Sequence, residues 1–196
     1  AKATVGKAHE VLSWLEDLGA NFDRKVPQLD LSREGGHTVH RVVHAGGDTT
    51  GAEIQRALSE ALLSHPRVTV RSPALVQDLV VHEGRCVGVT ATVLDQELAV
   101  EAGAEILATG GAGQIYRETT NPTGASGCGQ ALSFRAGAQL TDCEFVQFHP
   151  TTLYIAGASR FLISEIVRGA GAVLRDRHGE AFMQDAHPMG DLAPRY

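Results

Sequence analysis

The stretch Glu105-Ile106-Leu107-Ala108-Thr109-Gly110-Gly111 decides the fold prediction, because an apolar segment runs directly into a pair of glycines. We predict a strand over residues 105–108, with a glycine turn at its carboxyl end. Open α/β sheets bind nucleotides at that end of a strand, and glycine has no Cβ to keep a ligand away from the backbone. A tight turn after a buried strand explains the same residues equally well. The chain contains no Gly-x-Gly-x-x-Gly, the usual dinucleotide fingerprint, to decide between the two interpretations.

The composition also favours an α/β protein. The 196 residues include 22 glycines, and only 5% of positions are aromatic, which suits a chain that brings its backbone close to a ligand. A formal net charge of -6 argues against a nucleic-acid partner, since phosphate binding needs a basic face. No apolar run approaches the roughly 20 residues that span a bilayer, so we expect a soluble, cytoplasmic protein. The three cysteines show no Cys-x-x-Cys spacing and predict reduced thiols.

Regular elements are predicted on the N-terminal side of this stretch. An apolar stripe from His9 to Leu18 predicts a short helix that ends at Gly19. A strand is predicted over residues 39–43, and the sequence 48–51 supplies N-cap chemistry for a helix through about Ser64. We expect that helix to bury three side chains. Glu83-Gly84 reads as the turn of a hairpin between apolar strands. The buried helix positions are Ile54, Leu58 and Leu62.

On the C-terminal side, a helix is predicted over residues 126–136, followed after Asp142 by short β-like pieces and loops. This change predicts two domains, 1–142 and 143–196. The chain starts in the middle of a pattern and stops without a terminating signal, so we expect a fragment of a longer protein.

Several polar residues in this second part invite functional readings. His149 precedes a proline and is therefore biased towards an extended conformation at a strand end, where its ring can face a cleft; a structural histidine is the alternative. Glu165 and Arg168 are three residues apart, so a helix would place them side by side as an ion pair, which is usually a surface feature. Arg195 reads by itself as a surface residue beside a proline.

Three histidines, His37, His40 and His44, resemble a metal-binding spacing. On the predicted strand only His40 and His44 would share a face, because side chains alternate along a strand. The glutamate of the zincin motif is also absent between them. We therefore predict no metal site.

The motifs taken together resemble the fumarate reductase and succinate dehydrogenase flavoprotein superfamily, and within it the L-aspartate oxidase family. The resemblance implies part of a Rossmann-like FAD-binding domain, followed by the start of an α+β capping domain, with FAD as the cofactor. It also implies that the fingerprint glycines lie upstream of this chain and that further flavin and substrate residues lie downstream. The matching motifs are Ala108-Thr109-Gly110-Gly111, Thr120-Asn121-Pro122, Gly127-Cys128-Gly129, Arg135-Ala136-Gly137-Ala138, Gln147-Phe148-His149-Pro150-Thr151, Ser164-Glu165-Ile166-Val167-Arg168-Gly169 and Ala193-Pro194-Arg195.

The resemblance implies roles for ten residues. Those matching the flavin-binding positions are Thr109, Gly110, Gly111 and Cys128, the last standing where the family usually has aspartate. A thiol accepts hydrogen bonds poorly, so this departure weakens the expected flavin contact. The substrate-binding positions are His149 for a carboxylate, Ser164, and Glu34 for the amino group. The catalytic positions are Arg195 for proton transfer, with Glu165 and Arg168 as its relay.

The reaction implied is oxidation of L-aspartate to iminosuccinate, the first step towards quinolinate and NAD. A hydride leaves the α-carbon for FAD, and O2 or fumarate accepts the electrons; quinolinate synthase is then a candidate partner. The sequences 160–165 and 188–195 favour the oxidase over the dehydrogenase and reductase flavoproteins. Two alternatives stay open, namely the flavoprotein subunit of succinate dehydrogenase or fumarate reductase, and a non-catalytic or FAD-independent α/β domain.

Overall fold

The computed structural model describes residues 2–149, 151–157 and 160–194, and the chain divides into two units. Unit 1 comprises Ala1–Thr69 with Ile163–Tyr196, and unit 2 comprises Val70–Leu162. The elements of unit 1 are α1 (Lys2–Val5), α2 (Ala8–Asp17), β1 (Arg24–Lys25), β2 (Gln28–Leu29), β3 (Leu31–Ser32), β4 (Val42–Val43), α3 (Thr50–Ser64), α5 (Ile166–Gly169), α6 (Met183–Ala186) and η2 (Gly190–Leu192). Those of unit 2 are β5 (Ala74–His82), β6 (Arg85–Val93), β7 (Gln96–Glu101), η1 (Gly113–Ile115), α4 (Cys128–Arg135), β8 (Thr152–Leu153) and β9 (Phe161–Leu162). No described helix is both long and apolar enough to cross a membrane.

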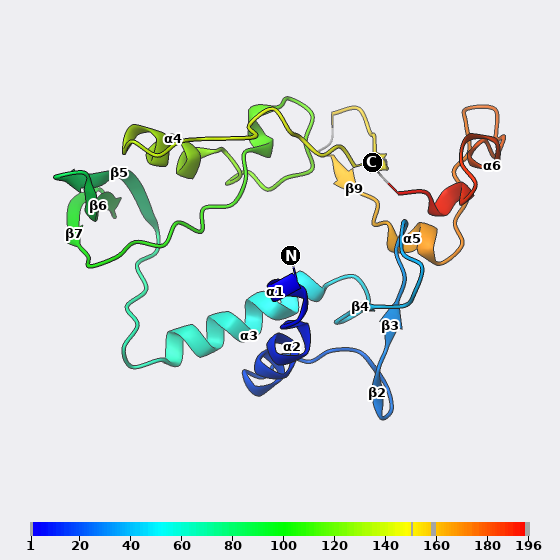
Figure 1. The fold of residues 1–196 in the computed structure, drawn as a ribbon, viewed down its shortest axis with the longest axis horizontal. Helices are drawn as coiled ribbons and strands as arrows, with labels where there is room; N and C mark the ends of the chain where they lie inside the picture. The colour runs from blue at the N-terminus through cyan, green and yellow to red at the C-terminus, as the bar shows by residue number, and fades with distance from the viewer. Residues whose placement is uncertain (1, 150, 158–159, 195–196) are drawn as a thin grey trace. The chain divides into compact units, whose positions relative to one another are not determined.

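The predicted first helix is confirmed as α2, which lies beside α3 in unit 1 (Figure 1). Gly19 follows it with a φ of +89°, and its N–H donates to the Glu16 carbonyl over 2.8 Å, as expected of a glycine that ends a helix. Leu15 is buried. Trp14 remains 51% exposed, so only part of the predicted apolar stripe faces the core.

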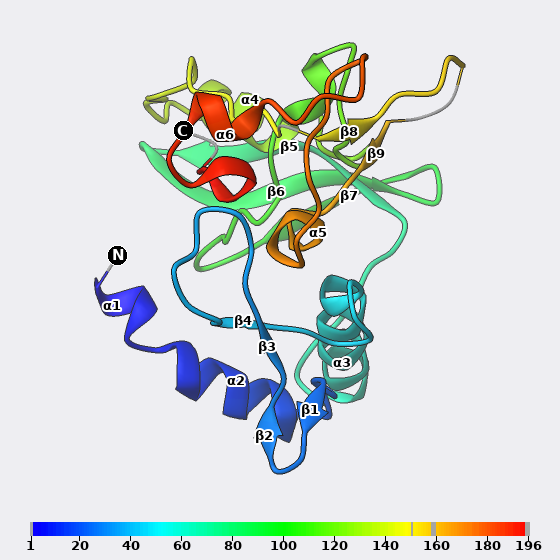
Figure 2. The same cartoon turned by 90° about the vertical axis from the view of Figure 1, so that its right-hand side faces the viewer.

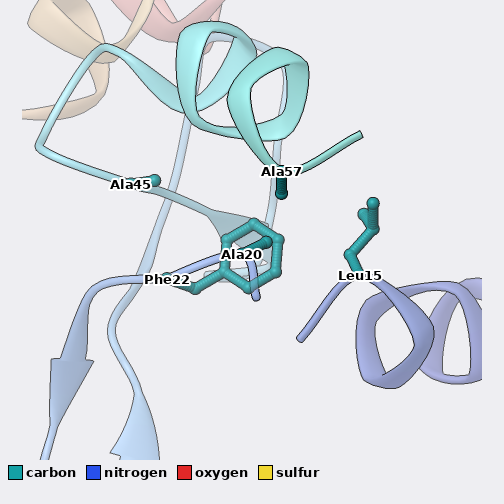
Figure 3. Packing of buried hydrophobic residues seen from close by; sticks show 5 residues of the cluster. All are labelled: Leu15, Ala20, Phe22, Ala45 and Ala57. Carbon is teal, nitrogen blue, oxygen red and sulfur yellow. The ribbon is translucent and has the colours of Figure 1, made fainter. Parts of the chain in front are cut away.

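The predicted second helix is confirmed as α3, but its buried face differs from the prediction. Ala57 is fully buried, whereas Leu62 is 46% exposed, so the expected burial of Leu62 is wrong. The small Ala57 side chain lets α3 approach a cluster formed by Leu15, Ala20, Phe22 and Ala45 (Figure 3). Ile54 and Leu58 pack against the same cluster. Leu62 lies one turn beyond this contact.

The start of α3 is tied to the turn after α2 by an ion pair. Glu53 Oε1 accepts the Asn21 N–H over 2.7 Å and an Arg56 N–H over 2.7 Å. Arg56 also donates to the Gly19 carbonyl over 2.6 Å. The Arg56 hydrogen bond, helped by the Asn21 N–H, lowers the pKa of Glu53 to about 2, and Glu53 in turn raises the pKa of Arg56. The capping prediction at the same end is wrong in detail, because Thr49 Oγ1 donates to the Ala45 carbonyl and no side chain caps α3.

Two predicted strands do not form as expected. The strand expected over residues 39–43 shrinks to β4, Val42–Val43, which pairs antiparallel with β3. The strand expected over residues 105–108 is absent, and Ile106 is 93% exposed. A strand needs a neighbour to accept its hydrogen bonds. No other described segment pairs with residues 105–108. Their apolar character is not enough to form a strand without such a partner.

Unit 2 contains an antiparallel sheet in the order β5-β6-β7 (Figure 2). The predicted hairpin turn is confirmed, since Glu83 and Gly84 both have positive φ values, 49° and 75°. A second turn at Leu94 and Asp95, with φ values of 48° and 62°, leads into β7, which the sequence analysis missed. This turn lacks glycine, the residue that usually marks such backbone angles.

The predicted helix over residues 126–136 is confirmed as α4, Cys128–Arg135. Arg135 fastens its C-terminal end to β5 by donating to the Gln77 carbonyl over 2.9 Å and pairing with Asp78 over 3.2 Å. The short strands expected after Asp142 are confirmed as β8 and β9. The predicted domain boundary near residue 142 stays a prediction.

We predict that Glu53→Gln lowers the free energy of unfolding at pH 7, and that the loss shrinks as the pH falls. A carboxylate with a depressed folded-state pKa stabilises the fold above its unfolded pKa of about 4.3, and this stabilisation disappears as the pH falls through about 2. Urea unfolding of the full-length protein between pH 7 and pH 3 measures the effect. Glu60→Gln is the matched control, because Glu60 pairs with the same arginine but is 65% exposed. Equal losses for both variants at every pH would contradict the assignment.

Candidate functional site

Two glycine motifs, 18 residues apart in sequence, lie against each other in unit 2. A Cβ on Gly129 would overlap the Thr109 side chain, lying 2.8 Å from Thr109 Cβ. The Gly127 N–H donates to the Gly111 carbonyl over 3.2 Å. The predicted motifs 109–111 and 127–129 are therefore brought together, and glycine is needed at 129 for the contact.

This glycine cluster leaves backbone open for a ligand. A Cβ built on Gly110 or Gly111 would meet no heavy atom within 4 Å. Cys128 is exposed at the first position of α4, after Gly127 with a φ of +78°, and no side chain caps the helix. The first N–H groups of a helix lack intrahelical partners and carry a partial positive charge. The cluster therefore fits a nucleotide approaching through the backbone, although the Cys128 thiol is a weak acceptor for its hydroxyl groups.

His149 lines a cavity of about 670 Å³ in unit 2, together with Thr119, Asn121 and Arg160. The ring is half-buried, and its Nδ1 lies 3.2 Å from the Thr151 nitrogen and 3.0 Å from the Thr151 oxygen. When the Thr151 N–H donates to Nδ1, the proton of a neutral ring sits on Nε2, which can then donate to an anionic group. The expected position at a strand end is wrong, since His149 has no regular structure and β8 starts at Thr152.

In unit 1, Arg168 forms a buried ion pair with Glu165, and each side chain is only 6% exposed. The interpretation as a surface pair is therefore wrong. Arg168 Nη2 donates to Glu165, while Nη1 donates to the Asp191 carbonyl over 2.9 Å and the Ala193 carbonyl over 3.4 Å. One guanidinium thus joins α5 to the backbone of η2 and of Ala193 directly after it.

The loop that carries Glu34 packs against the same guanidinium. A Cβ on Gly35 would lie 2.7 Å from Arg168 Nη2, and the Gly36 N–H donates to the Leu192 carbonyl over 2.7 Å. Glu34 is half-buried, and its N–H donates to His37 Nδ1 over 3.4 Å. The structure therefore gathers the Glu34 loop, the Glu165–Arg168 pair and the segment 191–194 around one buried charge.

Ser164 and Arg195 complete the predicted set in this part of the chain. Ser164 is half-buried directly before Glu165, and its Oγ accepts the Ile166 N–H over 3.4 Å. Arg195 lies outside the described residues. Its neighbour Pro194 is described, and a Cβ on Gly36 would lie 3.4 Å from it.

Two further residues, not predicted from the sequence, shape this cluster. Gly169 allows α5 to approach the Arg33 carbonyl, which a Cβ at that position would overlap. Asp191 Oδ1 accepts the Leu174 N–H over 2.7 Å and so anchors the segment that Arg168 binds. A glycine directly after Arg168 was the available signal for close packing; nothing in the sequence marked Asp191.

Comparison with known proteins identifies the family. The family model described as "FAD binding domain" matches residues 1–196, which is the entire chain. The chain belongs to the FAD-binding domain family. This match confirms the expected cofactor, FAD, and the expected α/β fold class. The glycine cluster is a place where such a dinucleotide can approach the backbone.

Curated proteins similar to this chain include several named L-aspartate oxidase. This chain is 51% identical over 187 residues to "L-aspartate oxidase" of Streptomyces coelicolor, and the match covers 90% of this chain and 32% of that protein. It is 44% identical over 185 residues to "L-aspartate oxidase" of Bacillus subtilis, covering 92% of this chain and 34% of that protein. The chain thus spans about a third of the length of these relatives.

Solved structures of flavoproteins share the fold. A chain of Escherichia coli quinol fumarate reductase matches with a TM-score of 0.85 at 30% identity, over 92% of this chain and 31% of that one. The open conformation of a flavocytochrome c3 fumarate reductase matches with a TM-score of 0.70 at 34% identity, over 91% of this chain and 32% of that one. The predicted resemblance to the fumarate reductase superfamily is confirmed.

We predict that Gly129→Ala lowers the melting temperature and the flavin content of the full-length protein. The added methyl group collides with Thr109, and such overpacking typically costs about 1–3 kcal/mol. Gly124→Ala is the matched control, because a Cβ there meets no heavy atom within 4 Å. Differential scanning fluorimetry and absorbance near 450 nm report the two effects. Equal behaviour of both variants would rule out the close contact.

Proposed function

We propose that the full-length protein is an FAD-dependent L-aspartate oxidase that forms iminosuccinate. The observation that carries the proposal is the buried Glu165–Arg168 pair, which fastens the segment leading to Arg195. It occurs in a chain whose curated relatives carry the name L-aspartate oxidase. A buried pair of this kind is costly unless its hydrogen bonds are satisfied, so its presence marks a constrained site.

Three residues are assigned to the substrate. His149 donates from Nε2 to one carboxylate of L-aspartate, and the Ser164 hydroxyl adds a further hydrogen bond. Glu34, held in a half-buried loop beside Arg168, attracts the ammonium group. Together these residues would recognise a dicarboxylic acid that also carries an amine. Hydrogen-bond donors meet its carboxylate, and a carboxylate meets its ammonium group.

Arg195 is assigned to proton transfer, with Glu165 and Arg168 as the relay that restores its proton. A guanidinium ordinarily has a pKa above about 12, so it acts as a proton-transfer group only within a relay that exchanges the proton quickly. Its charge also polarises the substrate next to the carboxylates. The short path from Glu165 to Arg168, and from Arg168 to the backbone of residues 191–193, supports this assignment.

FAD is assigned to the glycine cluster, with Thr109, Gly110, Gly111 and Cys128 as its contacts in this chain. Bound there, FAD would supply the redox chemistry, as acceptor of the hydride from the substrate α-carbon and donor of the electrons to O2 or fumarate. The residues of the chain bind and orient FAD and the substrate, and the cofactor carries the redox chemistry. Residues 1–142 then form part of the FAD-binding domain and residues 143–196 the start of a capping domain.

The product assignment places the enzyme before quinolinate formation in NAD biosynthesis. Iminosuccinate hydrolyses readily because its imine carbon is electrophilic, so a consuming enzyme close by is favourable. Quinolinate synthase is the partner we propose for that step.

The second candidate is the flavoprotein subunit of succinate dehydrogenase or fumarate reductase, favoured by the structural match to quinol fumarate reductase. The two functions differ in substrate. We expect the full-length protein to release hydrogen peroxide with L-aspartate and not with succinate, measured by a peroxidase-coupled assay. Turnover of succinate alone would replace the first proposal with the second.

Removal of the proposed proton-transfer group provides the next prediction. Arg195→Leu abolishes L-aspartate oxidation, while absorbance near 450 nm shows that flavin stays bound. Arg177→Leu, a change in an exposed turn of unit 1, leaves the rate unaltered. Retained turnover in the Arg195 variant would contradict the role.

Restoring a carboxylate at position 128 tests the flavin contact. Cys128→Asp raises the fraction of protein that retains FAD through gel filtration, because a carboxylate accepts hydrogen bonds that a thiol accepts poorly. Cys143→Asp, at another exposed cysteine, is the matched control and leaves retention unchanged. A colourless full-length protein that gains no thermal stability from added FAD would exclude the cofactor assignment for both forms.

A further inference from the structure

A second arginine, Arg160, lines the His149 cavity, and its side chain is only 16% exposed. Its Nη2 pairs with Glu118 Oε2 over 2.5 Å. Its guanidinium carbon lies 4.1 Å from the centroid of the Tyr154 ring. Arg160 is therefore held on one side by a carboxylate and on another by an aromatic face, both of which also line the cavity.

These contacts connect two segments that are distant in sequence. Glu118 belongs to the segment that follows η1, whereas Tyr154 and Arg160 flank the two-stranded ladder of β8 and β9. The ladder pairs Leu153 with Phe161, so Tyr154 and Arg160 stand next to each other just beyond it. Arg160 thus joins the 113–121 wall of the cavity to the wall made by the β8–β9 hairpin.

The charge of Arg160 is already matched within the chain. Glu118 neutralises it, and a planar guanidinium over an aromatic ring gains attraction that a lysine ammonium cannot reproduce in the same geometry. An arginine held by both contacts ties the two walls of the cavity together. Walls that are set before binding spare a ligand the entropy cost of ordering them.

We propose that Arg160 is a positioning residue that sets the width of the His149 cavity for a dicarboxylic acid. The proposal rests on the proposed function, in which His149 holds one substrate carboxylate. Arg160 acts through Glu118 and Tyr154 on substrate affinity, and proton transfer by the residues of unit 1 does not involve it.

The test separates affinity from turnover in the full-length protein. Arg160→Ala raises KM for L-aspartate about tenfold, as expected when its cation–π and ion-pair contacts are both lost, and changes kcat less than twofold. The Kd of succinate, added as an unreactive dicarboxylate and followed by perturbation of the flavin absorbance, rises by the same factor. Arg160→Lys keeps the charge and recovers less than half of the loss.

Two controls make the outcome decisive. Arg177→Ala removes a cation from an exposed turn of unit 1 that does not line this cavity, so KM stays within twofold of the wild type. Combining Arg160→Ala with Glu118→Gln produces no further rise in KM, because both changes break one connection.

Several results would overturn the proposal: an unchanged KM and Kd, a fall in kcat equal to the rise in KM, additive effects in the double variant, or a loss of flavin and melting temperature in Arg160→Ala. Failure of the proposed function gives a different result, since the wild type would then show no turnover of L-aspartate. In that case succinate still decides whether Arg160 sets the cavity, through its Kd if it is unreactive or through its KM if it is turned over, compared between wild type and variant.

Discussion

The buried ion pair between Arg168 and Glu165 organises the part of unit 1 that contains the Glu34 loop, α5 and residues 191–193. Both side chains are 6% exposed, and a charge removed from water in this way must be satisfied by partners within the protein. The two terminal nitrogens of Arg168 meet this need with one carboxylate and two backbone carbonyls, while its buried Nε has no hydrogen-bond partner among the described residues. These carbonyls belong to residues 191–193. The hydrogen bonds that satisfy the buried charge of Arg168 therefore also hold this segment in place.

Glycine residues provide the space that these close contacts need, because a Cβ would collide with the neighbouring group. Gly35 gives the guanidinium room, and Gly169 lets α5 pack on the backbone of residue 33. In unit 2, Gly129 plays an equivalent part against Thr109. Each of these positions brings backbone close to a neighbouring group, which is why a chain with 22 glycines and few aromatic residues can gather its polar groups into small clusters.

Local sequence signals determine the helices and turns of this chain more directly than its strands. The helices α2, α3 and α4 and the turn at Glu83 and Gly84 were predictable, because helix periodicity and turn chemistry act between residues close in sequence. The strand over residues 105–108 was not, because a strand is stabilised by a neighbour that the local sequence does not specify. The missed strand β7 illustrates the same limit, since its turn at Leu94 and Asp95 lacks a glycine signal.

From the sequence alone came the α/β class, the helices α2, α3 and α4, the glycine motifs and the residues that carry charge. It also carried the resemblance to the flavoprotein superfamily, because that likeness lies in the order of residue types. Only the tertiary structure decided that Glu165 and Arg168 are buried, that the 109–111 and 127–129 motifs touch, and that Arg160 connects two walls of a cavity. Burial and contact depend on groups brought together from distant parts of the chain, and a residue's own neighbours in sequence do not encode them.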